Sequence, residues 1–150
     1  MHTNWQATCL VEGSGSGQVL ILDEPLSLWG GLNPQTGEII DRRHPQSGRI
    51  VTGRVLILPA GRGSSSASSI LLEAVRAETA PTAIITAEAD SILALGAVVA
   101  QEIYGQSLPV VVLEGGDFTA VCAHLSAFPQ TTVRVQNELV ILDDQEIGQD

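Results

Sequence analysis

The sequence contains no lysine. Its basic side chains are seven arginines against 17 acidic residues, which gives a formal net charge of −10 over 150 residues. This balance argues against binding to nucleic acids, which requires clustered basic side chains, and against an anionic membrane surface. Aromatic residues make up only 3% of the chain, while hydrophobic residues make up 44%. That composition excludes a disordered chain and predicts one domain with an aliphatic core.

Cysteine is also scarce. Cys9 and Cys122 are too few for a disulfide framework, and an iron–sulfur cluster usually takes four protein ligands. No cysteine or histidine pair has the spacing of metal ligands, so we expect no metal held by this chain. No apolar run reaches the roughly 18 residues of a membrane span, and the first residues do not resemble a signal peptide. We therefore expect a cytoplasmic protein with reduced thiols.

The middle of the chain alternates apolar runs with helical patterns. Strands are expected at Arg54–Pro59, Thr82–Thr86 and Leu108–Leu113, and helices from the serines at 64–69 onward and at Ser91–Tyr104. Asp90 or Ser91 is the expected cap of the second helix. Strands that alternate with helices predict a parallel sheet with right-handed crossovers.

Further strands are predicted on both sides of this central unit. The runs Ala7–Glu12 and Gln18–Leu22 are separated by the Gly/Ser segment Gly13–Gly17, which we expect to be a hairpin loop rather than a phosphate-binding loop. Near the end, a helix is expected at Phe118–Phe128 and strands at Thr131–Val135 and Leu139–Leu142. These strands cannot all join the central sheet in sequence order, so we predict an α/β domain with an additional β layer.

One turn carries the clearest chemical signal. Gly61-Arg62-Gly63-Ser64 lies between a predicted strand and a predicted helix start, the position where α/β sheets bind ligands. The glycines allow close backbone approach, and the guanidinium suits a carboxylate or phosphate. The simpler alternative is that the serines only cap the helix. The turn lacks the lysine of a Walker loop and is not a Gly-x-Ser-x-Gly nucleophile elbow.

The histidines support a Ser–His–Asp triad only weakly. His44 lies in the basic cluster Arg42–Pro45, which is typical of a solvated surface but is also able to contact a ligand. Its spacing does not place it near Ser64. His124 lies in an apolar helical pattern, where a structural role is the simpler interpretation.

Five short motifs stand in a characteristic order. They are Glu24–Gly31 (EPLSLWGG), Gly37–Asp41 (GEIID), His44-Pro45, Gly61–Ser64 (GRGS) and Ile92–Ala97 (ILALGA). Together they resemble the aconitase X family, and specifically its small subunit or swivelling domain, which some members fuse to the large one. The resemblance covers about Gly13 to Leu113.

The resemblance implies a swivelling β/β/α domain like the mobile last domain of aconitase. We therefore expect residues 1–142 to form a single swivel domain and residues 143–150 an acidic polar tail. The implied partner is a large subunit, which in this family carries the cysteines of an iron–sulfur cluster and most of the substrate pocket.

The resemblance also implies an activity, the removal of water from a hydroxy acid. Known substrate classes are cis-3-hydroxy-L-proline in bacteria and 5-phosphomevalonate in archaea; general likeness to bacterial members favours the first. A non-catalytic module that binds small anions is the alternative from a different class.

Site residues follow from the same resemblance. The resemblance implies that Ser64 is the proton-abstracting base. From its charge beside the helix start we expect Arg62 to bind the substrate, together with Gly63 and Ser65. Trp29, Gly30 and His44 are loop contacts to the pocket or the large subunit. Ser65 and Ser66 stand where relatives often have Cys, Thr or Gly, so Ser65 is a second candidate for the role of Ser64.

Overall fold

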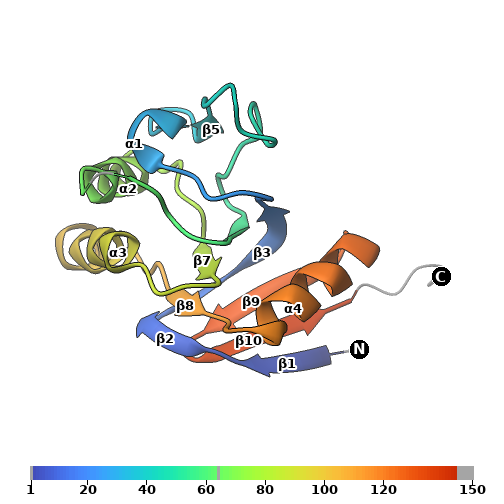
Figure 1. The fold of residues 1–150 in the computed structure, drawn as a ribbon. Coiled ribbons are helices and arrows are strands. Elements are labelled where there is room, and N and C mark those ends of the chain that lie inside the picture. The colour runs from blue at the N-terminus through green and yellow to red at the C-terminus, as the bar shows by residue number, and fades with distance from the viewer. Residues whose placement is uncertain (1, 64, 145–150) are drawn as a thin grey trace, which may run out of the picture.

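The computed structural model describes residues 2–63 and 65–144, and an eight-stranded mixed sheet forms its framework (Figure 1). Four strands run parallel at the centre: β3 (Ser14–Ile21), β6 (Val55–Leu58), β7 (Ala83–Thr86) and β8 (Val110–Val112). Antiparallel strands extend the sheet on both sides: β9 (Thr132–Gln136), β10 (Leu139–Asp143) and β1 (His2–Gln6) beyond β3, and β2 (Thr8–Val11) beyond β8. The predicted α/β class with parallel central strands is confirmed, and the strands predicted as an additional β layer continue the same sheet.

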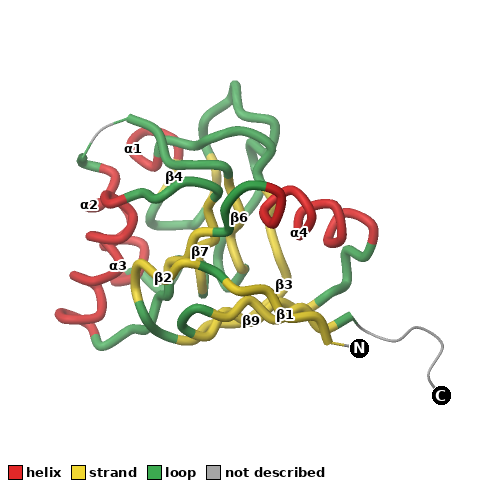
Figure 2. The backbone as a smooth tube through the Cα atoms, turned by 60° about the horizontal axis from the view of Figure 1, so that its bottom comes forward, coloured by secondary structure: helices red, strands yellow, loops and turns green. Residues whose placement is uncertain are grey.

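Helices cover both faces of this sheet. On one face lie α2 (Ala67–Arg76) and α3 (Ser91–Tyr104), and on the other lies α4 (Gly116–Ala127) (Figure 2). The sequence of β6 is apolar without interruption because both faces of this strand are buried. Its Leu56 and Leu58 join the core beneath α2 and α3, whereas Val55 and Ile57 join the core beneath α4. None of the described helices has the length and apolarity that a membrane span needs.

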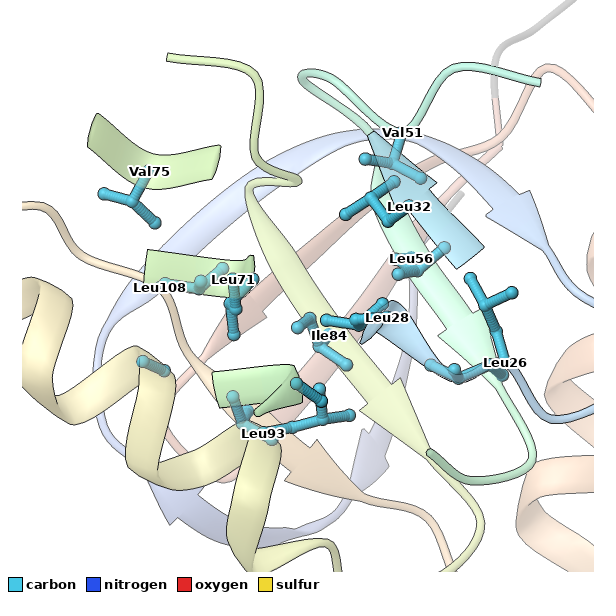
Figure 3. Packing of buried hydrophobic residues seen from close by; sticks show 14 of the residues in the cluster. Leu26, Leu28, Leu32, Val51, Leu56, Leu71, Val75, Ile84, Leu93 and Leu108 are labelled. Carbon is cyan, nitrogen blue, oxygen red and sulfur yellow. The ribbon is translucent and has the colours of Figure 1, made fainter. Parts of the chain in front are cut away.

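A small region packs beside α2, on the same face of the sheet (Figure 1). It contains α1 (Leu28–Gly31) and a two-stranded sheet of β4 (Leu32–Asn33) and β5 (Glu38–Ile39). Leu26, Leu28 and Leu32 anchor it to the main core, since all three are buried in the cluster that also contains Leu56 and Ile84 (Figure 3). The region runs along α2. Leu26 pairs with Gly61 at the carboxyl end of β6, whereas the Pro34 carbonyl accepts a hydrogen bond from Thr79 Oγ1 at 2.6 Å, before β7 begins.

The Gly/Ser segment is not a hairpin loop, so that prediction is wrong. Residues 14–18 are the first part of β3 and pair with β9, and residues 19–21 then pair with β6. A Cβ atom on Gly15 would lie 2.0 Å from the carbonyl oxygen of Thr82, and one on Gly17 would lie 2.6 Å from that of Gly53. The glycines thus allow neighbouring loops to approach the strand closely, a long-range requirement that looks like a turn signal in the sequence.

The helix predicted at Ser91–Tyr104 is confirmed with its cap. The Asp90 carboxylate accepts hydrogen bonds from the backbone N–H groups of Ile92 and Leu93, both at 3.0 Å. Gly105 ends the helix in the left-handed conformation, with φ of 67°. By contrast, α2 begins after Ser66, which occupies the N-cap position without a side-chain cap hydrogen bond.

The first residues of the expected tail pack against the described fold. Asp143 ends β10, and the Asp144 carboxylate accepts a hydrogen bond from Thr131 Oγ1 at 2.6 Å and lies 2.8 Å from His124 Nε2. His124 therefore has a structural contact with this end of the chain. Residues 145–150 lie outside the described residues, and the division at 142/143 stays a prediction.

Asp144 makes stability depend on pH. Its hydrogen bonds from Thr131 and His124 hold the pKa of its carboxyl below the ordinary value of 3.8. The stabilisation is therefore complete above that value and is lost as the pH falls through the lower folded-state pKa. We expect Asp144→Asn to lower the melting temperature at pH 7, with the difference shrinking towards pH 3. Circular dichroism melts across this range, with Glu12→Gln as an exposed control, check this; a pH-independent difference contradicts it.

Candidate functional site at the carboxyl ends of the central strands

Three loops meet where the parallel strands end. The loop after β6 carries Gly61-Arg62-Gly63, the loop after β7 carries Asp90, and the loop after β3 carries Leu26. Leu26 forms a parallel β-bridge with Gly61, so the first and third loops run side by side. Parallel strands place their following loops at one edge of the sheet, which is where ligands bind in α/β proteins.

A cavity lies between these loops. Its walls combine apolar side chains of Leu26, Leu28 and Leu93 with the polar groups of Arg62 and Asp90. Apolar walls with a few converging polar groups are typical of small-molecule sites. The full lining is Leu26, Leu28, Gly61, Arg62, Gly63, Ala67, Asp90, Ile92 and Leu93.

Asp90 ties two of the loops together. One of its carboxylate oxygens caps α3, and the other, Oδ2, accepts a hydrogen bond from the Gly61 N–H at 3.0 Å. A Cβ atom on Gly61 would lie 2.2 Å from that oxygen, so a larger residue at 61 requires the carboxylate to move. The sequence indicated Asp90 only as a helix cap. Asp90 follows a predicted parallel strand and so lies at the same edge of the sheet as Gly61. That position was the signal that could have identified Asp90 as a residue of the candidate site.

A second cavity adjoins the first through Arg62. It is lined by Glu24, Pro25, Asp41, Arg43, His44 and Arg62. The structure thus brings Arg62 and His44 to one cavity, although sequence spacing could not place them together. Arg62 is exposed and makes no ion pair with any residue in the described ranges. Its guanidinium is therefore available to an anion.

His44 is part of the structure of its loop. It is only 6% exposed, in contrast to the solvated surface expected for the Arg42–Pro45 cluster, whose two arginines are exposed. Its Nδ1 accepts a hydrogen bond from the Gln46 N–H, and its Nε2 lies 3.0 Å from the Glu24 carbonyl oxygen. This pattern fits a neutral ring that donates from Nε2. Both ring nitrogens thus have backbone partners, and a ligand contact stays a prediction.

The remaining residues of the glycine turn have different surroundings. Ser64, the expected base, lies outside the described residues. Gly63 lines the first cavity with φ of 91°, and a Cβ atom there would lie 3.0 Å from Ser27 Oγ. Ser65 is exposed, and its carbonyl accepts a hydrogen bond from Ser68 Oγ at 2.9 Å. Gly63 therefore lies at the cavity, while Ser65 does not line it.

The two predicted loop contacts in α1 are at the surface. Trp29 is 58% exposed, and Gly30 has a φ of 80° at a kink within the short helix. Neither lines either cavity. Their role as contacts stays a prediction.

The described residues do not suit a metal centre. Within residues 2–63 and 65–144, no three His, Cys, Asp or Glu side chains gather where they could hold a metal ion. Cys9 lies in β2 and Cys122 in α4, and burial raises the pKa of both thiols, which disfavours the thiolate form that binds metals. An iron–sulfur cluster does not fit the described side chains of this chain.

Comparisons with known proteins agree on one family. The family model for the aconitase X swivel domain matches residues 4–141. The chain is 50% identical over 115 residues to cis-3-hydroxy-L-proline dehydratase from Pseudomonas aeruginosa. The aligned region covers 77% of this chain but only 20% of that relative. It is 47% identical over 88 residues to the phosphomevalonate dehydratase small subunit from Methanothermobacter thermautotrophicus, covering 59% of this chain and 67% of that relative.

A solved structure agrees with the sequence relatives. The crystal structure of aconitase X from Thermococcus kodakaraensis in its holo-form superposes with a TM-score of 0.76 at 28% identity, over 93% of this chain and 98% of that one. The chain spans only a fifth of the length of the dehydratase that it matches from P. aeruginosa. The family match and the shared fold confirm the resemblance found in the sequence. The chain belongs to the aconitase X swivel-domain family.

Proposed function

We propose that this chain is the swivel-domain part of a hydro-lyase that removes water from cis-3-hydroxy-L-proline, and that it acts together with a larger aconitase X chain. The position of Arg62 is the observation that supports this function most directly. It is a guanidinium without an ion-pair partner in the described ranges, and it joins two cavities at the carboxyl edge of the sheet. Such a group suits a substrate carboxylate.

In the proposed reaction the C–H bond beside the carboxylate breaks and its proton moves to Ser64. The electron pair forms a carbon–carbon double bond, and the 3-hydroxyl leaves and takes up a proton as water. The resulting enamine tautomerises to Δ1-pyrroline-2-carboxylate. A serine hydroxyl is a weak base, so it needs an electropositive setting to act in its deprotonated form.

This chain offers such a setting near residue 64. Arg62 stands two positions before Ser64, and α2 begins shortly after it, at Ala67. The N-terminus of α2 and the guanidinium both favour negative charge. By contrast, the N-terminus of α3 already holds the Asp90 carboxylate. We assign carboxylate binding to Arg62 with Gly63, and Ser65 to a supporting role in substrate binding.

We assign the iron–sulfur cluster of the family to the larger chain, because the described residues of this chain do not fit one. Activation of the leaving hydroxyl is a task that such a cluster performs as a Lewis acid. The proposed tasks of this chain are to hold the carboxylate and to take up the proton.

Two observations bear on the choice of substrate. The match to the hydroxyproline dehydratase covers 77% of the chain at 50% identity, against 59% at 47% for the phosphomevalonate dehydratase subunit. The second cavity adds Arg43 beside Arg62, and a second guanidinium suits a substrate that carries both carboxylate and phosphate. Phosphomevalonate is therefore the alternative substrate, and a non-catalytic anion-binding module is the alternative function.

A substrate assay separates these alternatives. The chain is purified in complex with the larger aconitase X chain from the same genome, and water loss is followed by NMR. We expect turnover of cis-3-hydroxy-L-proline and none of trans-4-hydroxy-L-proline, whose hydroxyl is not on the carbon next to the α-carbon. Turnover of 5-phosphomevalonate alone identifies the other dehydratase. No turnover of either, with tight carboxylate binding by the isolated chain, establishes the binding module.

A further inference from the structure

The helix α3 is apolar on its outer side as well as its inner side. Its inner side is buried through Leu93, Gly96, Ala97 and Ala100. Yet Leu95, Val98 and Ile103 are 55%, 43% and 60% exposed, and Ile92 and Val99 are half-buried. We call Ile92, Leu95, Val98, Val99 and Ile103 the α3 outer face. The only charged residue in the helix is Glu102.

The neighbouring helix shows what a solvated outer side looks like in this protein. α2 packs beside α3 on the same face of the sheet. Its outer side carries Ser69, Glu73 and Arg76, and the last two form an ion pair. A helix that is apolar all round is typical of burial, whereas one apolar stripe suffices for a helix that only covers a sheet. The sequence of α3 therefore suits a helix with neighbours on both sides, and the described chain supplies only one of them.

The α3 outer face begins at the candidate site. Ile92 belongs to this face and also lines the first cavity, next to Asp90 and Leu93. The remaining residues of the face continue along the helix away from the cavity at spacings of three and four residues. A partner protein that covers the first cavity from the side of α3 would therefore also contact the α3 outer face.

We propose that the α3 outer face is the surface on which the larger aconitase X chain docks, an inference that rests on the function proposed above. The chain corresponds to a fifth of the dehydratase from P. aeruginosa, so most of that protein lies outside the matched part and is available to cover the site. A second copy is a poorer occupant, because each copy carries a formal charge of −10 and like charges oppose self-association. The partner surface must be apolar and is expected to place a basic side chain opposite Glu102.

The test compares two sets of substitutions in the co-expressed complex. Leu95→Glu with Val98→Glu places two charges in the α3 outer face. Phe128→Glu is the matched control, since Phe128 is 53% exposed and follows α4 on the other face of the sheet. We expect the double variant to bind the larger chain on the order of 100-fold more weakly, while the wild type and Phe128→Glu bind equally well. Thermal melts of each isolated variant verify that it folds.

Hydrogen exchange of the wild type gives a measurement that needs no substitution. We expect the amide hydrogens of α3 to exchange more slowly when the larger chain binds. We also expect covalent labelling of the side chains in the α3 outer face to decrease. Normal binding by the double variant, with no new protection of α3, overturns this docking surface but leaves the dehydratase function intact. Failure of the wild type to bind any larger chain overturns both proposals. A dimer of the isolated chain that the double variant disrupts, seen by light scattering, assigns the face to a second copy and overturns the inference.

Discussion

Ser64→Ala is expected to lower kcat for water loss by about a thousandfold in the complex with the larger chain, because alanine cannot accept the proton. KM should change little, since Arg62 is proposed to hold the carboxylate independently of the hydroxyl. Steady-state kinetics with cis-3-hydroxy-L-proline give both quantities. Near-wild-type turnover of this variant overturns the proposed role of Ser64.

Two further serine variants sharpen that result. Ser69→Ala is the matched control, because Ser69 is exposed on the outer side of α2 and lines neither cavity. Ser65→Ala asks whether the neighbouring serine is the base instead. A larger loss of kcat in Ser65→Ala than in Ser64→Ala reassigns the proton transfer to Ser65. Solvent exchange of the α-proton of the substrate, followed by NMR, shows whether the loss lies in the proton-transfer step.

Asp90→Asn is expected to reduce kcat/KM by roughly 30-fold. An asparagine side chain keeps one oxygen to cap α3 but turns an NH₂ group towards the Gly61 N–H, so two donors face each other. Loss of a hydrogen bond to a charged group costs about 2 kcal/mol, which corresponds to that factor if the whole cost falls on the placement of the Arg62 loop. Kinetics at a temperature well below the melting transition measure this effect apart from stability.

Asp90→Ser separates the two tasks of the carboxylate. Serine is a good helix cap, but its hydroxyl is too short to cap α3 and reach Gly61 as well. We therefore expect Asp90→Ser to melt close to the wild type and still to raise KM, because Arg62 is no longer held in place. Equal KM values for all three proteins contradict a positioning role for Asp90.

Local signals explain which elements could be predicted. The helix Ser91–Tyr104 was predicted with its bounds because its cap, its apolar pattern and its terminal Gly105 are all close in sequence. The same holds for β6 and β7, whose uninterrupted apolar runs reflect burial on both faces. The start of β3 could not be predicted, because its Gly15 and Gly17 are required by the close approach of Thr82 and Gly53, which lie far along the chain.

The candidate site divides in the same way. The sequence identified the Gly61–Ser64 turn, since a glycine turn between a strand and a helix carries its own local signature. It could not show that Asp90 bonds to Gly61, that Arg62 joins two cavities, or that His44 lines the second of them. Each of these contacts joins segments that meet only when parallel strands align their carboxyl ends.

By itself, then, the sequence determined the class of fold, the family and the turn that carries the chemistry, because periodicity, caps and short motifs act over a few residues. Only the tertiary structure decided what surrounds that turn and which side of α3 stays open. Both depend on the packing of segments distant in sequence. The chain has no lysine and a net charge of −10, which argued against nucleic acids, yet the fold gathers Arg62 and Arg43 at one cavity as a local positive site.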